Sequence, residues 1–318
     1  MIGSIYSDLD ELKKLLSKLN KNLSYLDEVI CVISDINSQK KIQEVSKLKE
    51  ILKGKIYIIY KEKIVFPGDA RNIGIRKSNS KYICFLDSHT LPDKNWISNS
   101  LKILKEKKIR GCLGKAKFIA NNEFEDCFIS ATYGNNPLTS IPGTLIEKDL
   151  LKEIGFFIPL NRSGEDAEWI NRSKKFYPFL NQSQVIPCKY IGLKEQGLIC
   201  LLKKWYKYSS STVNPRFYSQ RIIYYSFSIT FILLLAFSWN DKVANWDQSS
   251  FFYLPHISKI VISLIVLIYI SYRMILLPRR KKVKIFRFKI IKFFKFFFIS
   301  LILDLIKLIA FINRKDIS

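Results

Sequence analysis

Histidine and paired cysteines are scarce in this sequence. Its 318 residues include two histidines and six cysteines, and no two cysteines form a C-x-x-C pair or a metal-finger spacing. Zinc fingers and a disulfide framework are therefore excluded, and we expect the cysteines to be reduced packing residues. The chain also lacks an internal repeat and a low-complexity linker. One principal domain with an appendage is the first expectation for this length.

Acidic residues are also few, since 27 Asp and Glu stand against 52 Lys and Arg and give a net charge of +25. Such an excess can serve nucleic-acid binding. The distribution argues against that partner, because the densest basic block, 278–292, directly follows an apolar segment, whereas the connection 240–256 carries only Asp241, Lys242 and Asp247 as charges. We therefore expect a membrane surface as the basic block's partner, and no nucleic acid.

Three apolar segments predict a membrane region at 211–318. The runs 222–239 and 257–277 are each long enough to cross a bilayer as a helix, and the basic block after the second places both ends of this hairpin in the cytoplasm. The third segment, about 285–312, carries Lys and Asp in an apolar background. It is either a third span or a helix in the membrane interface, and the interface is favoured.

The remaining part of the chain, 1–210, is predicted to be a cytoplasmic domain of a protein of the inner cell membrane. Its first 30 residues lack the apolar h-region of a secretory signal peptide. The pattern of this domain is α/β. Helical leucine and isoleucine spacings cover 9–19 and 42–52, and a further helix is expected to begin at Glu165.

Short apolar, β-branched runs at 29–33, 56–60 and 82–86 alternate with those helices. Strands that are apolar throughout are buried on both faces, which is typical of a parallel sheet covered by helices. Ligands of such sheets bind beyond the carboxyl ends of the strands. Asp35 follows the first run and Asp87 follows the third, so the sequence predicts two acidic side chains at the ligand-binding edge.

Asp87 and His89 lie two residues apart at the predicted strand end. Side chains with this spacing on a strand point the same way and can share one cation. A carboxylate with an imidazole suits Mn²⁺ or a similar divalent ion better than Ca²⁺. The alternative is an aspartate that caps the turn beside an incidental histidine, and these three residues alone leave both interpretations open.

A longer stretch resembles a known family. In the segment 66–96, A-R-N-I-G at 70–74 leads to a strand that ends in D-S-H at 87–89. This resembles the donor-binding half of family 2 glycosyltransferases with the GT-A fold, a Rossmann-like nucleotide-diphospho-sugar transferase fold, in its D-x-H variant. "VICVISDIN" at 29–37 and "GEDAEWINR" at 164–172 match two further motifs of that family.

The resemblance implies a role for each matching residue. The residues that would contact the nucleotide-sugar are Asp35, Arg71, Asp87 and Gly143. The metal ligands for Mn²⁺ or Mg²⁺ would be Asp87 and His89. Asp166 would be the catalytic base that accepts the acceptor proton, with Glu165 shaping the acceptor side.

The function that the resemblance implies is an inverting glycosyltransferase. It would move a sugar from a nucleotide-diphosphate donor to a membrane-associated, lipid-linked glycan in surface-polysaccharide or cell-envelope glycan biosynthesis. Two alternatives stay open. One is transfer to polyprenyl phosphate itself. The other is a noncatalytic membrane scaffold with a degenerate GT-A fold, which is suggested by the short first strand at 2–6.

Overall fold

The computed structural model divides the chain into two compact units. The N-terminal unit comprises 1–129 and 135–197, and the C-terminal unit comprises 130–134 and 198–318. The described residues are 1–52, 54–161, 164–191, 193, 197–210, 247–249, 264, 266–285 and 289–312.

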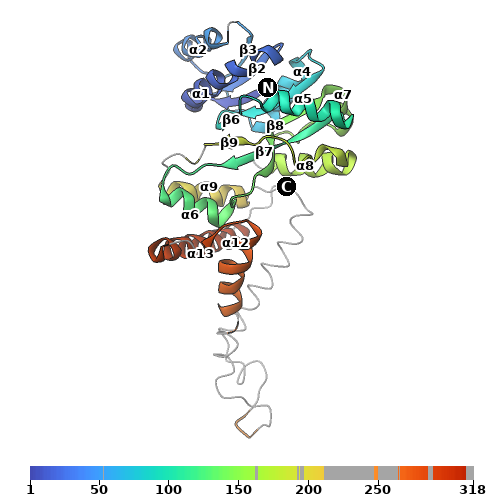
Figure 1. Cartoon of the computed structure of the whole chain (residues 1–318). Helices are drawn as coiled ribbons and strands as arrows, with labels where there is room; N and C mark the ends of the chain where they lie inside the picture. Colours follow the sequence, from blue (N-terminus) through green and yellow to red (C-terminus); the bar gives the residue numbers. More distant parts are fainter. Residues whose placement is uncertain are drawn as a thin grey trace. The chain divides into compact units, whose positions relative to one another are not determined.

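A four-stranded parallel sheet in the order β3-β2-β1-β5 opens the N-terminal unit (Figure 1). Its strands are β1 (Ile2–Ile5), β2 (Val29–Ser34), β3 (Ile56–Lys61) and β5 (Leu86–Asp87). Ile2 and Cys31 pack into the core that includes α1, whereas Gly3 faces Ala70 of α4 on the other side, where an added Cβ would lie 3.2 Å from the Ala70 Cβ. Helices thus cover both faces, which confirms the predicted α/β architecture.

The helices follow the predicted patterns in most places. Their bounds are α1 (Leu9–Leu19), α2 (Gln39–Ser46), α3 (Leu48–Ile51), α4 (Pro67–Lys77), α5 (Trp96–Lys107), α6 (Glu123–Thr132), α7 (Lys148–Ile154) and α8 (Glu165–Phe176). The helical pattern at 42–52 is divided between α2 and α3. Gly155, with φ of 93°, terminates α7, because a residue without Cβ adopts this conformation without strain.

A second, mixed sheet of five strands has the order β4-β8-β7-β9-β6. Its strands are β4 (Tyr82–Cys84), β6 (Thr90–Leu91), β7 (Gly111–Phe118), β8 (Leu138–Glu147) and β9 (Cys188–Tyr190). β8 pairs antiparallel with both β4 and β7, and only the β7–β9 pair is parallel. The long strands β7 and β8 therefore form the centre of this sheet.

The predicted single strand at 82–86 is wrong, because it consists of two short strands in different sheets. Phe85 is the residue at which the chain crosses. Its N–H donates to the Thr144 carbonyl at 3.1 Å and its carbonyl accepts from the Gly143 N–H at 2.8 Å, while the N–H of Leu86 donates to the Met1 carbonyl at 2.9 Å. The buried Phe85 ring packs edge-on against Phe157 at 5.7 Å. One residue therefore joins the two sheets.

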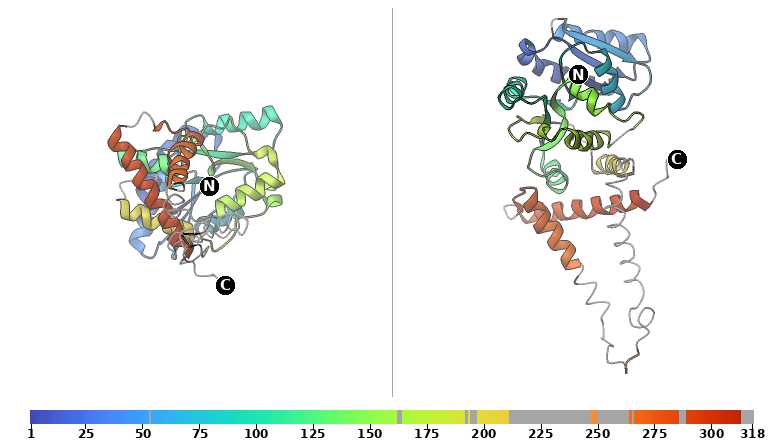
Figure 2. Two further views of the ribbon diagram at one scale, coloured as in Figure 1. Left: turned by 90° about the horizontal axis from the view of Figure 1, so that it is seen from below. Right: turned by 90° about the vertical axis from the view of Figure 1, so that its right-hand side faces the viewer.

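The C-terminal unit is helical in its described part. It contains α9 (Leu198–Ser210), a helix at 266–280 whose middle, Tyr272–Leu276, is π-helical and whose end is α12 (Leu277–Arg280), and α13 (Ile290–Ile312). The helix at 266–280 and α13 run in clearly different directions (Figure 2).

The predicted membrane segments are covered only in part. The run 222–239 lies outside the described residues, and the run 257–277 is described only at 264 and 266–277. Within the described ranges, none of the helices combines the length and the apolar character that crossing a membrane requires. α13 corresponds to the third predicted segment, and its position in a membrane interface stays a prediction.

The six cysteines all lie in the described part of the chain and are present as thiols, not disulfides. Four of them, Cys31, Cys112, Cys127 and Cys188, are buried, and Cys84 is half-buried. These positions confirm the expected packing role. The expectation is wrong for Cys200, which is exposed on α9.

Replacing Phe85 by Ala should destabilise the N-terminal unit by about 3–5 kcal/mol, because it removes a fully buried aromatic ring at the crossing between the sheets. Thermal unfolding of the full-length protein measures this loss. Tyr82→Ala, on the same segment but exposed, is the matched control and should cost less than about 1 kcal/mol. Equal losses in the two variants would contradict the structural role of Phe85.

Candidate active site

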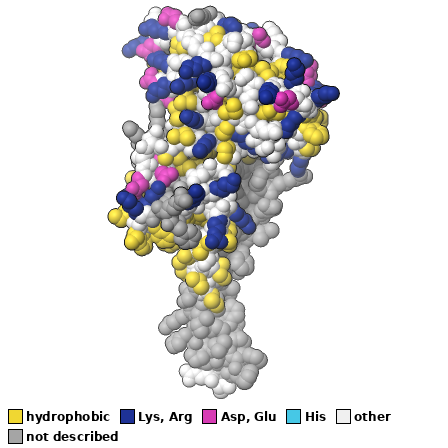
Figure 3. Space-filling view, viewed as in Figure 1, with side chains coloured by type: hydrophobic (Ala, Val, Ile, Leu, Met, Phe, Trp, Pro, Cys, Tyr) yellow, Lys and Arg dark blue, Asp and Glu magenta, His cyan; other side chains and the backbone are white. Residues whose placement is uncertain are grey.

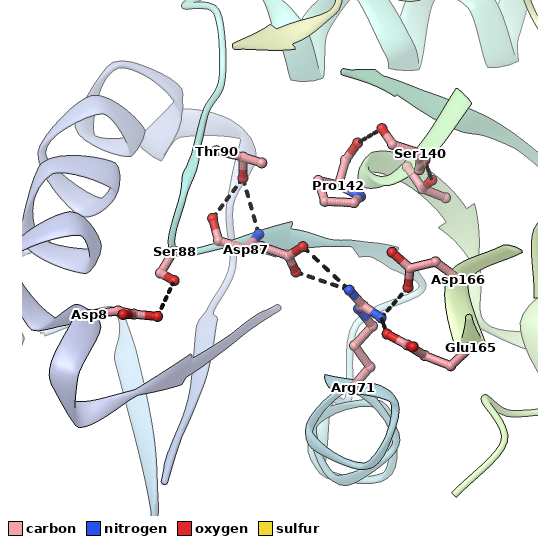
Figure 4. A network of polar contacts seen from close by, with 10 residues as sticks. Asp8, Arg71, Asp87, Ser88, Thr90, Ser140, Pro142, Glu165 and Asp166 are labelled. Atoms are coloured by element: carbon pink, nitrogen blue, oxygen red, sulfur yellow. Dashed lines mark hydrogen bonds and ion pairs between the residues drawn. The ribbon is translucent and has the colours of Figure 1, made fainter. Parts of the chain in front are cut away.

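The guanidinium of Arg71 lies among three carboxylates from distant parts of the chain (Figure 4). Its Nη2 is 3.1 Å from Asp87 Oδ1, and its Nη1 is 3.3 Å from Glu165 Oε1 and 2.5 Å from Asp166 Oδ1. The Arg71 side chain is only 4% exposed. The structure therefore brings together four of the residues that the sequence selected, and we call them the Arg71 cluster.

The A-R-N-I-G segment on α4 positions Arg71. The neighbouring side chain, Asn72, donates from Nδ2 to the Phe157 carbonyl at 2.8 Å and accepts the Phe157 N–H at 3.0 Å. The Phe157 ring lies beneath the guanidinium of Arg71, 5.2 Å away. At Gly68 a Cβ would approach the Ile158 carbonyl to 3.0 Å, so the glycine permits close packing. These contacts hold α4 against the chain that precedes α8.

Asp87 ends β5, as predicted, and the chain then turns. The Asp87 N–H donates to Thr90 Oγ1 at 3.1 Å, and the Thr90 hydroxyl donates to the Asp87 carbonyl at 2.7 Å. With the backbone fixed on both sides by Thr90, the carboxylate is directed at Arg71.

Glu165 and Asp166 begin α8 directly after Gly164, whose φ is 89°. Acids in a first helical turn are stabilised by the helix dipole, which favours both residues at this position. Their exposure differs, since the Glu165 side chain is 6% exposed and that of Asp166 is 38% exposed. Further along α8, Glu168 pairs with Arg172 one turn later, at 2.7 Å, and neither belongs to the Arg71 cluster. Asp166 is therefore the accessible acid of the pair at the start of α8.

The Arg71 cluster has one guanidinium and three carboxyl groups, and this imbalance affects the pKa values of the carboxyl groups. Burial, with the neighbouring Asp166, raises the pKa of Glu165 from 4.5 to about 8 despite Arg71. Burial also raises the pKa of Asp166; Arg71 opposes this effect and Asp87 adds to it. Burial alone would lower the pKa of Arg71, but the surrounding carboxylates raise it. Near neutral pH the pair of Glu165 and Asp166 therefore holds a proton.

His89 does not share a ligand position with Asp87 in this arrangement. Its Nε2 lies 3.3 Å from Asp8 Oδ2, and its buried Nδ1 has no hydrogen-bond partner in the described part of the chain. The expectation of parallel side chains rested on strand geometry, but the strand ends at Asp87 and residues 88–89 form a turn. Asp87 and His89 consequently contact different partners, Arg71 and Asp8.

A ready-made metal centre is not found among the described residues, since no three His, Cys, Asp or Glu side chains are close enough together to hold an ion. The two predicted ligands differ in their contacts. The Asp87 carboxylate is engaged by Arg71, whereas the buried Nδ1 of His89 has no hydrogen-bond partner among the residues that the structure describes. A metal at this position would need ligand atoms from a bound molecule as well.

Asp35 and Gly143 lie outside the Arg71 cluster. Asp35 follows β2 with a φ of 65° and pairs with Lys41 at 3.1 Å. The Gly143 carbonyl accepts the Trp96 Nε1–H at 2.9 Å, and a Cβ there would lie 3.1 Å from Cys188 Sγ. Gly143 therefore has a packing role in this structure. Donor contacts by Asp35 and Gly143 stay predictions.

Two residues of the site were missed from the sequence. Asp8 lies shortly after the end of β1 and contacts His89. The rule that ligands bind beyond the ends of parallel strands would have selected Asp8 together with Asp35 and Asp87. Asn72, next to Arg71, was visible only as a letter of the A-R-N-I-G motif. Asn72 positions α4 through its hydrogen bonds to the backbone of Phe157, which is 85 residues away in the sequence. A local sequence pattern does not indicate such a distant contact.

Comparisons with known proteins agree with this geometry. The family description "Glycosyl transferase family 2" matches residues 4–163. Among solved structures, the chain is similar to the mannosyltransferase PcManGT from Pyrobaculum calidifontis in complex with GDP-Man and Mn²⁺. The identity is 11% and the TM-score 0.50, over 94% of this chain and 86% of that one. This likeness shows a shared α/β fold of the GT-A kind.

A second similar structure is TarS 1–349 of S. aureus in complex with UDP-GlcNAc, with 18% identity and a TM-score of 0.44 over 66% of this chain. The chain spans 63% of that structure's length. No curated protein matches the sequence.

Glu165→Gln should flatten the dependence of stability on pH. The folded-state pKa of Glu165 is raised from 4.5 to about 8, so the folded state binds more protons than the unfolded state in this interval. Stability therefore falls as pH rises from about 4.5 to about 8, and a glutamine removes this contribution.

The measurement is the thermal midpoint of the wild type and the variant at several pH values between 5 and 8. Glu106→Gln, an exposed acid on α5, is the control and should leave the curve unchanged. A Glu165→Gln curve that runs parallel to the wild-type curve would show that Glu165 is ionised throughout.

Proposed function

Because the chain belongs to glycosyl transferase family 2, we propose that it transfers a sugar from a nucleotide-diphosphate donor to a membrane-associated acceptor, with inversion at the anomeric carbon. The observation that carries this proposal is the Arg71 cluster. It joins the acid at the end of β5, on the donor side of the family motif, to the acids that begin α8, on the acceptor side. A single displacement needs these two sides next to each other.

Asp166 is the base in this proposal. The acceptor hydroxyl attacks the anomeric carbon while its proton passes to the Asp166 carboxylate, and the bond from that carbon to the donor phosphate breaks. The nucleoside diphosphate leaves on the opposite face, which inverts the configuration. A base is most effective when its pKa approaches the working pH, and the pKa of Asp166 is raised.

Arg71 and Glu165 position this base. Arg71 fixes one carboxylate oxygen of Asp166 and leaves the side chain 38% exposed to an acceptor. Glu165 is enclosed behind it and, when protonated, adds no negative charge next to the leaving diphosphate. Arg71 can in addition donate charge-assisted hydrogen bonds to the diphosphate when the donor displaces Asp87.

Mn²⁺ or Mg²⁺ is the proposed cofactor, with Asp87 and His89 as the residues that would hold it. For both to reach one ion, Asp87 would have to leave Arg71 and His89 would have to leave Asp8, and phosphate oxygens of the donor would complete the ligand set. When bound, the ion would stabilise the negative charge that develops on the diphosphate.

The proposed acceptor is a lipid-linked glycan for surface polysaccharide or cell-envelope glycan, and the proposed site of action is the cytoplasmic side of the inner membrane. The basic block after the apolar run 257–277 and the exposed apolar side chains of α13, among them Ile290, Ile291 and Phe294, support a membrane location.

Asp166→Asn should lower the turnover number by about 10²- to 10⁴-fold, because an amide cannot accept the acceptor proton. Release of nucleoside diphosphate from UDP-GlcNAc and from GDP-Man, with cell membranes as the acceptor source, measures it. Asp149→Asn, which changes an exposed acid in the first turn of α7, is the control and should be fully active.

Binding of the nucleotide should survive Asp166→Asn, which separates lost chemistry from lost folding. An unchanged turnover number would indicate an acceptor that needs no base, and polyprenyl phosphate is the candidate of that kind. Absence of nucleotide binding in a folded wild-type protein would support the noncatalytic scaffold instead.

Metal removal should weaken nucleotide binding, and His89→Ala should have the same effect. Calorimetry with UDP and GDP, with Mn²⁺ and with a chelator, should give an affinity in the chelator at least about tenfold weaker, a free-energy difference of about 1.4 kcal/mol. In the variant, Mn²⁺ should restore little of this loss. Binding that is identical with and without the metal would remove the cation from the proposal.

A further inference from the structure

The C-terminal unit contains a cavity of its own, with a volume of about 440 Å³. Its walls come from the end of α6, from α9, from the helix at 266–280 and from α13. Its polar and aromatic lining residues are Trp205, Tyr269, Tyr272, Arg273, Lys281, Asp304 and Lys307. The volume is in the range of small-molecule sites. We call it the C-terminal cavity.

Positive charge predominates in the C-terminal cavity. Arg273, Lys281 and Lys307 face one carboxylate, Asp304, which lies 3.0 Å from Arg273 Nε and 3.1 Å from Lys307 Nζ. Burial, with the neighbouring charges of Arg273 and Lys307, lowers the pKa of Lys281 to about 8. A net charge of plus two in a partly buried space favours an anionic ligand.

The backbone around the cavity is specialised. The helix at 266–280 widens to a π-helix at Tyr272–Leu276, which ends two residues before Pro278, a residue without the N–H of a regular helix. Such π-helical turns are frequent at functional sites. The turn carries the buried Arg273.

The side chain of Lys281, like that of Arg273, is held in place by its neighbours. Its ammonium donates to the carbonyls of Ala131, at 3.2 Å, and Thr132. Gly134, with a φ of 76°, admits the Lys281 side chain, because a Cβ at 134 would overlap it. The two cations, Arg273 and Lys281, are therefore fixed by the fold rather than solvated side chains at a surface.

The rest of the lining is apolar and continues into an exposed apolar surface. Leu277, Leu301, Leu305 and Leu308 line the cavity. Hydrophobic side chains also gather on the C-terminal unit in Figure 3. Among the exposed ones are Leu264, Val266, Leu267, Ile268, Ile290, Ile291, Phe294 and Phe298. An apolar surface of this kind beside a cationic cavity fits a molecule with an anionic head and a hydrocarbon tail.

We propose that the C-terminal cavity binds the phosphate or diphosphate group of the acceptor's lipid carrier, with the first part of its hydrocarbon chain along the leucines. This inference rests on the proposed function, since it names the part of the acceptor that the protein holds outside the Arg71 cluster. The occupant is a phosphate ester of a long-chain alcohol.

Charge matching favours this occupant over an ordinary phospholipid headgroup. A phosphate monoester carries close to two negative charges at neutral pH, and a diphosphate linkage carries two as well, whereas a phosphodiester headgroup carries one. The two surplus positive charges of the cavity match the charge of a phosphate monoester or a diphosphate linkage, and not that of a phosphodiester. Trp205 and Tyr272 add amphipathic ring surfaces where a polar head meets a hydrocarbon chain.

The test uses the full-length protein in a neutral detergent and farnesyl phosphate as the probe, with farnesol as its uncharged analogue. Calorimetry should detect farnesyl phosphate and not farnesol. Lys281→Gln and Lys307→Gln should each weaken binding on the order of tenfold. Lys284→Gln removes the same charge from an exposed position outside the cavity and should change the affinity less than about twofold.

Nucleotide binding, measured on the same samples, keeps the two proposals separate. If Lys281→Gln still binds UDP or GDP but no longer binds farnesyl phosphate, the result supports a lipid-phosphate site in the C-terminal cavity. If the wild type binds farnesyl phosphate but neither nucleotide, the result supports that site and contradicts the proposed function. Equal losses in Lys281→Gln and Lys284→Gln would overturn the inference. Competition by phosphatidylglycerol at equal concentration, or by inorganic phosphate alone, would also overturn it, in favour of a membrane anchor or a free-phosphate site.

Discussion

The buried guanidinium of Arg71 is the constraint on which the N-terminal unit depends. A charge that is 4% exposed requires partners, and the fold supplies carboxylates from the end of β5 and the start of α8. The carboxylates in turn require the arginine, because three acids at this distance could not remain close without it. Loss of Arg71 would leave the buried Glu165 without its counter-charge, and breaking such a buried pair costs about 3–5 kcal/mol. Stability and chemistry are therefore tied to one side chain.

Part of this arrangement could be predicted from the sequence. The runs at 29–33 and 56–60 became strands because β-branched and aromatic residues dominate them. The prediction of burial on both faces is confirmed for β2 and wrong for β3, which lies at the sheet edge and exposes Tyr57. The start of α8 at Glu165 was also predictable, because acids favour a first helical turn. Asp87, Arg71, Glu165 and Asp166 were selected by motif, and the structure brings them together.

Other parts depend on contacts that a local pattern does not contain. The run 82–86 is continuous in hydrophobicity, yet its two ends hydrogen-bond to different sheets, and pairing partners are set by distant segments. The parallel orientation expected for Asp87 and His89 assumed that the strand continued past Asp87. In the C-terminal unit, Asp304 looked out of place in an apolar segment because one of its partners, Arg273, lies on another helix, while the other, Lys307, lies on the same helix.

The crossing at Phe85 limits how this chain can change in evolution. Surface loops accept insertions and deletions at little cost, but the segment between β4 and β5 has no spare length, because one residue pairs with Thr144 on one side and its neighbour pairs with Met1 on the other. An added or deleted residue would turn the following side chains to the opposite face and direct Asp87 away from Arg71. Insertions and deletions should therefore accumulate in the surface loops, while the number of residues between β4 and β5 stays constant.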